Sequence, residues 1–176
     1  IKTTVDTNKW TLETGKGPNN NNDGWGNGES QTYTNSLDNA YVQNGALHIV
    51  ANKTGSDITS ARLKSVVDLE PYGYMEVKAK FFDPSTTLTA ANTETYMTGA
   101  WPAIWMLGKN IHEDGGYWDN NGFGTTPWPE CGEIDIMEHW GNDQNYVSSA
   151  MHTPSSYGGT FNTGGRYLST ASTAFH

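Results

Sequence analysis

The sequence predicts an all-β domain built as a β-sandwich or jelly roll. Helix signals are weak, because Gly, Asn, Thr and Ser interrupt the 176-residue chain every few residues and no long stretch keeps a 3.6-residue period. Short apolar or alternating stretches recur instead, separated by turn-rich segments. One pair of them predicts a hairpin: residues 41–43 and 46–50 flank Asn44-Gly45, a dipeptide that suits a type I′ turn.

Four further stretches are predicted to be strands. Residues 73–82 alternate between apolar and mostly charged side chains, which is typical of a half-buried strand. Residues 101–107 form an apolar run with a proline near its start, where the missing N–H does least harm. The remaining two predicted strands are residues 133–138 and 146–152.

Length, charge and composition exclude several classes of protein. A chain of 176 residues fits one domain. The net charge is −9 and the ten basic residues are scattered, whereas nucleic acid is bound by clustered Lys and Arg, so we expect no nucleic-acid partner. No run of about 18 apolar residues exists, so we expect no membrane-spanning helix. The seven Trp and nine Tyr suit either a surface that binds neutral sugar rings or an ordinary all-β core.

The most informative stretch carries acids among apolar residues. Glu133 and Asp135 share one face of a strand, but Glu138 lies an odd number of positions from Glu133 and would face the other way. A β-bulge at Ile136 or Met137 would bring all three acids to one face. The two Glu Cα atoms would then lie roughly 13 Å apart. Their side chains could close the carboxyl gap to about 5 Å, the spacing of a retaining glycosidase.

Two alternative roles for these acids stay open. Acids within six residues are common on solvated sheet faces, where they serve only solubility. Carboxylates also bind calcium, although a calcium site prefers an oxygen-rich loop and this stretch has aromatic neighbours.

The chain also resembles a known family. Residues 132–138, GEIDIME, are similar to the bulged E-x-D-x-x-E signature of glycoside hydrolase family 16, in the form typical of laminarinases and other endo-β-1,3-glucanases; the unbulged form is typical of lichenases. Further matching stretches follow in the expected order over nearly the whole chain: residues 25–29, 44–47, 59–62, 72–76, 101–108 and 151–152.

The resemblance implies a β-jelly-roll sandwich with a concave substrate cleft. It implies Glu133 as the nucleophile, Glu138 as the general acid/base and Asp135 as the assisting acid between them. Sugar-contacting residues expected in the cleft are Asn27, Arg62, Trp101, Trp105, Trp128 and His152. Trp faces suit the C–H faces of glucose. For Trp101 and His152 the competing role is core packing, and for Arg62 it is a surface ion pair.

The same resemblance sets expectations for the rest of the protein. Residues 1–176 form a single catalytic domain that looks incomplete at both ends, so we expect either a fragment or a second polypeptide that completes the fold. Catalysis should need no cofactor, while the family often carries a structural calcium ion whose ligands the sequence does not identify. The partner is a polysaccharide or oligosaccharide, and a polymer that cannot cross a membrane indicates a secreted enzyme.

The function expected is retaining endo-hydrolysis of internal β-1,3-glucosidic bonds in laminarin-type glucans. One alternative keeps the chemistry but changes the polymer to a mixed-linkage β-glucan or an algal galactan. Another is a non-catalytic β-glucan-binding protein on the same fold. Such proteins typically lose one or both catalytic Glu, and both are present here, which favours the enzyme.

Overall fold

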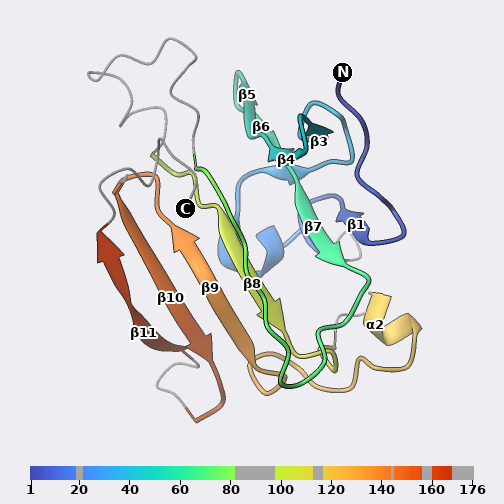
Figure 1. Ribbon diagram of the computed structural model, residues 1–176, viewed down its shortest axis with the longest axis vertical. Helices are drawn as coiled ribbons and strands as arrows, with labels where there is room; N and C mark the ends of the chain where they lie inside the picture. Colours follow the sequence, from blue (N-terminus) through green and yellow to red (C-terminus); the bar gives the residue numbers. More distant parts are fainter. Residues whose placement is uncertain (19–21, 82–97, 113–116, 144, 156–159, 168–176) are drawn as a thin grey trace. The chain divides into compact units, whose positions relative to one another are not determined.

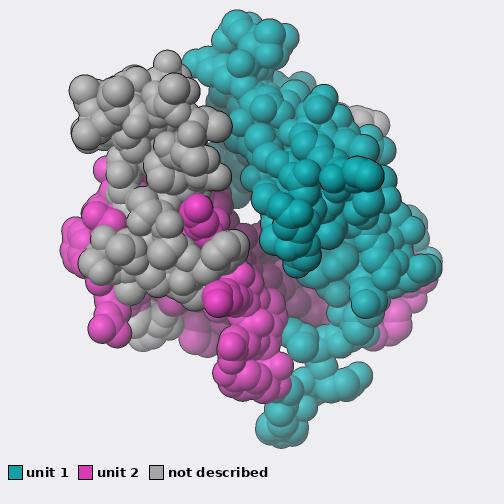
Figure 2. Space-filling view, turned by 45° about the horizontal axis from the view of Figure 1, so that its top comes forward, with its two compact units in different colours: residues 1–73, 113–120 teal, residues 74–112, 121–176 magenta. Residues whose placement is uncertain are grey.

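The computed structural model describes residues 1–18, 22–81, 98–112, 117–143, 145–155 and 160–167 (Figure 1). The chain divides into two compact units, residues 1–73 with 113–120 and residues 74–112 with 121–176 (Figure 2). Nearly all regular structure in both is strand, which confirms the all-β prediction.

The first unit holds three small sheets. Strand β1 (Trp10–Glu13) pairs antiparallel with β7 (Arg62–Ser65). Strand β6 (Asp57–Ser60) lies between β2 (Thr32–Tyr33), which it pairs parallel, and β5 (Asn52–Thr54), which it pairs antiparallel. Asn39 is among the most deeply buried side chains described. Its side-chain amide donates hydrogen bonds to the carbonyl of Val50 and to Thr59 Oγ1, so the buried N–H groups are satisfied.

The predicted hairpin is confirmed in this unit. Strands β3 (Ala40–Gln43) and β4 (Ala46–Ile49) pair antiparallel. Asn44 and Gly45 connect them with φ angles of 54° and 78°, so both central residues take the positive φ that a type I′ turn requires.

The second unit is organised around one sheet. Strands β8 (Ala103–Leu107), β9 (Glu133–His139), β10 (Tyr146–His152) and β11 (Thr160–Tyr167) form a four-stranded antiparallel sheet in the order β11-β10-β9-β8 (Figure 1). The first three were predicted. Pro102 precedes β8, and its carbonyl accepts a hydrogen bond from the His139 backbone N–H at 3.0 Å. Because Pro102 lies before the strand, its missing N–H removes no hydrogen bond from within β8, and its carbonyl adds one to β9.

One predicted strand is wrong. Residues 73–81 form no strand in the described chain, and residue 82 of that prediction lies outside the described residues. Tyr74 is 83% exposed and Val77 41%, while Phe81 is buried against the His139 ring at 5.2 Å. Alternation indicates which side chains would share a face, but a strand also needs a partner with free backbone groups.

Two long turn-rich segments contain short local structure. Within residues 15–28, Gly24–Gly28 (η2) is a tight turn in which Trp25 and Gly26 have φ of 57° and 78°. Within residues 108–129 lies the helix α2 (Tyr117–Asn120), and Ile111 bridges to Thr126. Across the described residues, no helix has both the length and the apolar character needed to cross a membrane.

Candidate active site

The predicted bulge is present in β9. Along β8, Ile104 lies opposite Met137, and the next residue, Trp105, lies opposite Asp135. Ile136 therefore has no partner on that side, and the pairing with β10 shifts at the same place. Ser149 donates its hydroxyl to the Ile136 carbonyl at 3.0 Å. The bulge thus has its own hydrogen bond, which satisfies a carbonyl that the interrupted ladder leaves over.

The bulge puts all three acids on one face of the sheet. Directly opposed residues in antiparallel strands point to the same side, and Leu107, Trp105 and Ala103 oppose Glu133, Asp135 and Glu138 in turn. Those three residues of β8 are spaced by two, so they share a face and the acids opposite them share it too. The prediction on which the proposed chemistry most depends is confirmed.

Glu133, the first of the acids, is held by an indole. Trp128 Nε1 donates to Glu133 Oε2 at 2.6 Å, and the Trp128 ring lies 5.4 Å from that of His152. Trp128 remains 47% exposed, so part of the side chain is open to solvent. A short N–H bond favours the ionised carboxylate and fixes its orientation.

Glu138, the last of the acids, has an indole of its own. Trp101 Nε1 donates to Glu138 Oε1 at 3.1 Å. The Trp101 ring stacks on that of Trp140, with centroids 4.8 Å apart and planes 14° from parallel. Two exposed tryptophans therefore stand beside this carboxylate. Trp101 is therefore a partly exposed neighbour of an acid and not a core residue.

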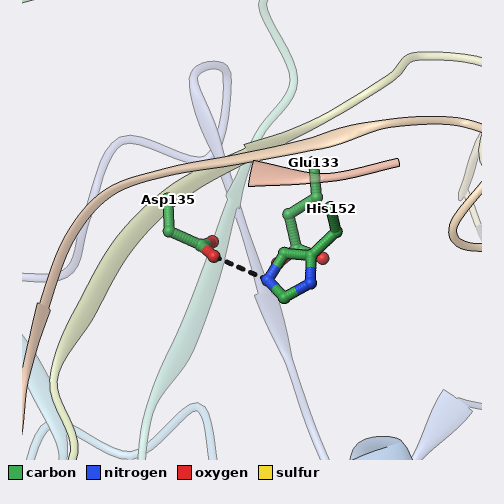
Figure 3. Close-up of side chains that lie close together, drawn as sticks. All are labelled: Glu133, Asp135 and His152. Carbon is green, nitrogen blue, oxygen red and sulfur yellow. Dashed lines mark hydrogen bonds and ion pairs between the residues drawn. The ribbon is translucent and has the colours of Figure 1, made fainter. Parts of the chain in front are cut away.

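Asp135, the middle acid, is the most deeply buried of the three at 5% exposure. It forms a 2.9 Å hydrogen bond with His152 Nε2, and the Glu133 carboxyl lies beside this pair (Figure 3). His152 comes from β10, directly opposite Glu133. The imidazole thus lies in the acid cluster.

Burial and neighbouring negative charge raise the pKa of two of these acids. Burial raises the pKa of Glu133, and the nearby Asp135 carboxylate raises it further, while the Trp128 hydrogen bond acts in the opposite direction. Burial also raises the pKa of Asp135, with the Glu138 charge adding to the effect and His152 opposing it. Both carboxyls therefore stay protonated to a higher pH than isolated acids would.

The same cluster has the composition of a metal site. Glu133, Asp135 and His152 each offer a ligand atom, and these atoms all lie within 4.8 Å of one another. An imidazole with carboxylates suits a transition metal more than calcium, which takes oxygen ligands. The cluster does not fit the structural calcium ion expected from the resemblance, and its ligand atoms already bond to one another and to Trp128.

Trp105 lies on the acid-bearing face, opposite Asp135 in the neighbouring strand.

The loop before Glu133 is held in place from the end of β8, where Gly108 donates its N–H to the Gly132 carbonyl at 3.0 Å. A Cβ at Gly108 would collide with the Cys131 carbonyl, so only glycine allows this approach. The glycine of the matched WPAIWMLG stretch therefore has a positioning role.

The remaining predicted site residues lie in the first unit. Asn27 Nδ2 donates to Glu29 Oε1 at 3.1 Å. Arg62 Nε donates to Glu13 Oε2 at 2.6 Å, and its guanidinium lies 4.5 Å from the centre of the Trp25 ring. Arg62 is thus a part-buried, paired and stacked residue, with Glu13 directly opposite it in β1.

Sequence reasoning missed two residues that the structure connects to the predicted set. Trp140 follows Glu138 by two positions, and this period-two spacing could have placed it on the acid-bearing face. Glu13 binds both Arg62 and Lys64, the latter at 2.9 Å. Nothing in the sequence around Glu13 indicates this pairing, because the partners lie 49 or more residues away along the chain.

Comparisons with known proteins bear on the whole chain. No protein-family model matches it. It is 36% identical over 179 residues to the beta-glucanase of Rhodothermus marinus, which covers 97% of this chain and 52% of that protein. It is 34% identical over 178 residues to glucan endo-1,3-beta-glucosidase A1 of Niallia circulans, which covers 94% of this chain and 22% of that protein.

The chain also matches solved structures of glucan-degrading enzymes. The structure of LamA from Zobellia galactanivorans in complex with laminaritriose and laminaritetraose matches with a TM-score of 0.76 at 32% identity. The match covers 100% of this chain and 67% of that one. The chain therefore spans about half, or less, of the two curated relatives and two thirds of the solved structure.

Proposed function

Because the chain belongs to glycoside hydrolase family 16, with laminarinases among its relatives, we propose that it is the catalytic part of a retaining endo-β-1,3-glucanase acting on laminarin-type glucans. The observation that carries this proposal is the bulged strand, which brings Glu133, Asp135 and Glu138 to one face, with an indole N–H on each outer acid. Paired carboxylates flanked by exposed tryptophans suit the cleavage of a neutral sugar chain.

The proposed chemistry has two steps. Glu133 attacks the anomeric carbon, the glycosidic C–O bond breaks, and Glu138 gives its proton to the leaving oxygen. Glu138, now a base, takes a proton from water, which cleaves the glycosyl ester and regenerates Glu133. In the free site the Asp135 carboxylate adds to the effect of burial in raising the pKa of Glu133, while the Trp128 N–H favours the ionised nucleophile. No cofactor enters either step.

The stereochemistry of the product tests the retaining mechanism. Proton NMR of laminarin during hydrolysis should show the β-anomer first, with the α-anomer appearing later by mutarotation. Initial release of the α-anomer would contradict the mechanism. Binding of laminarin with no release of reducing sugar would point to the non-catalytic alternative, and a reducing-sugar screen across mixed-linkage glucan and algal galactans would test the choice of polymer.

Azide rescue tests the two carboxylate roles separately. The Glu133→Ala variant should lose hydrolysis and keep oligosaccharide binding. With azide and a 2,4-dinitrophenyl β-laminarioside it should form the α-glycosyl azide, because azide replaces the missing nucleophile in one inversion. Glu138→Ala should give the β-azide through the glycosyl-enzyme. Wild-type turnover in Glu133→Ala, or the reverse pair of azides, would remove these assignments.

We extend the proposal to the contacts and context of the enzyme. Trp101, Trp105, Trp128 and His152 are proposed as glucan contacts, together with Asn27 and Arg62 from the first unit. We also propose that residues 1–176 belong to one catalytic domain, which a further segment or a second polypeptide completes, and that the enzyme is secreted. A structural calcium ion is proposed for the complete domain, and a lower Tm after chelation would support it.

A further inference from the structure

We propose that Trp140, stacked on Trp101, forms the first sugar-binding subsite on the leaving-group side of the cleavage point. The inference rests on the proposed function, in which Glu138 protonates the leaving oxygen. It adds a binding residue outside the set predicted from the sequence, and it assigns the pair formed by Trp101 and Trp140 to one side of the scissile bond.

The first support is the geometry of the pair. The two indoles stack with centroids 4.8 Å apart and planes 14° from parallel. Trp101 uses its N–H for Glu138, so that bond fixes the position of the ring relative to the carboxylate. Trp140 is 44% exposed, and Trp101 is 37% exposed. A large aromatic pair that is held in place yet left open to solvent is ready to receive an apolar ligand face.

The second support is the separation of the aromatic groups along β9. Trp128 and His152 lie with Glu133, at the start of the strand. Trp101 and Trp140 lie with Glu138, at its end. The nucleophile contacts the anomeric carbon of the sugar that stays, whereas the acid contacts the oxygen of the sugar that leaves. Aromatic rings beside Glu138 therefore meet the leaving sugar.

The competing role for Trp140 is to support Trp101 and thereby orient Glu138. In that case the loss of Trp140 would also slow the step in which water cleaves the glycosyl ester, because Glu138 is the base in that step and no sugar occupies the leaving side. If Trp140 binds the leaving sugar, its loss would impair only substrates that carry such a sugar. A pair of substrates that differ in the leaving group separates the two roles.

The experiment compares laminarihexaose with β-laminaribiosyl fluoride. In both, Glu133 forms the same kind of glycosyl ester and water cleaves it, but fluoride leaves after C1–F cleavage and fills no sugar subsite. In Trp140→Ala the ratio of kcat/KM for the hexaose to that for the fluoride should fall about tenfold, near the upper end of the effect of one aromatic contact. The kcat for the fluoride, which includes the water step that uses Glu138 as base, should stay at the wild-type value. Transfer of laminaribiose to an added glucoside should fall in parallel, and Trp140→Phe should retain much of both.

Phe123→Ala is the matched control, because Phe123 is equally exposed at 44% and lies in the same unit. Its ratio should stay at the wild-type value. An unchanged ratio in Trp140→Ala would overturn the inference, and so would a lowered ratio accompanied by a similar fall in kcat for the fluoride, since that result would assign Trp140 to the orientation of Glu138. If the wild-type protein cleaves neither substrate, the proposed function itself fails, an outcome distinct from a wild-type enzyme whose ratio ignores Trp140.

Discussion

Replacing Trp128 with phenylalanine tests the electrostatic role of its N–H on the proposed nucleophile. The substitution keeps an aromatic ring but removes the donor that lies 2.6 Å from Glu133 Oε2. An N–H bond to a carboxylate stabilises the charged form and lowers the pKa, so its loss raises the pKa of Glu133, which burial and Asp135 already raise. Because Glu133 must be ionised to attack, the acidic limb of the pH profile should move to higher pH.

The size of the shift follows from the hydrogen bond. A bond to a charged group contributes about 1.5–3 kcal/mol, and a half-exposed partner belongs at the lower end of this range. Trp128 is 47% exposed, so we take about 1.5 kcal/mol. At 1.36 kcal/mol per pKa unit, the acidic limb should move upward by about one pH unit.

The measurement is kcat/KM for laminarihexaose from about pH 3 to pH 8, a range that spans the usual carboxyl pKa values. On the plateau, Trp128→Phe should lose only what the smaller ring contributes to sugar binding. Trp140→Phe serves as the control, since it also exchanges an indole for a phenyl ring but has no bond to Glu133, and its acidic limb should stay in place. A Trp128→Phe profile with an unmoved acidic limb would show that this N–H does not tune the nucleophile.

Three further substitutions test the scaffold. Gly108→Ala should lower kcat at least tenfold and destabilise the fold by about 1–3 kcal/mol, because its Cβ would displace the loop before the nucleophile; wild-type kcat and Tm would refute this. Ser149→Ala should lower the free energy of unfolding by about 1 kcal/mol, measured by urea denaturation, because the Ile136 carbonyl loses its donor; an unchanged value would mean that water replaces the hydroxyl. Burial would raise the pKa of Glu13, but its two cationic partners lower it below 4.5, so Glu13 stabilises the fold above that pH and this contribution is lost as the pH falls through the lowered pKa. Glu13→Gln should therefore flatten the decline of unfolding free energy below about pH 4.5, and an unchanged slope would exclude this linkage.

The parts of the fold that local chemistry dictates could be predicted from the sequence. The Asn44-Gly45 turn needs two positive φ angles, and few other dipeptides supply them. The bulge could be predicted because the spacing of the acids breaks the period of a strand, and only a surplus residue restores a common face. Both inferences rest on neighbours in the chain and need no knowledge of distant partners.

The parts that depend on distant partners could not be predicted. Residues 73–82 alternate like a strand, but no described strand pairs with residues 73–81. The Glu13–Arg62 ion pair arises only because β1 lies beside β7. Residues 160–167, TFNTGGRY, lack a clean apolar alternation and carry paired glycines. They form strand β11 nevertheless, because they pair with β10.

The surplus residue at Ile136 changes the local path of the strand but not the span between the outer acids. Deleting it would leave an E-x-D-x-E stretch in which strict alternation alone keeps every acid on the same side. Glu133 and Glu138 lie opposite Leu107 and Ala103, four residues apart in β8, so four strand steps, roughly 13 Å, separate their Cα atoms with or without the surplus residue. A one-codon deletion would therefore remove the kink between nucleophile and proton donor while it keeps their common face and their span.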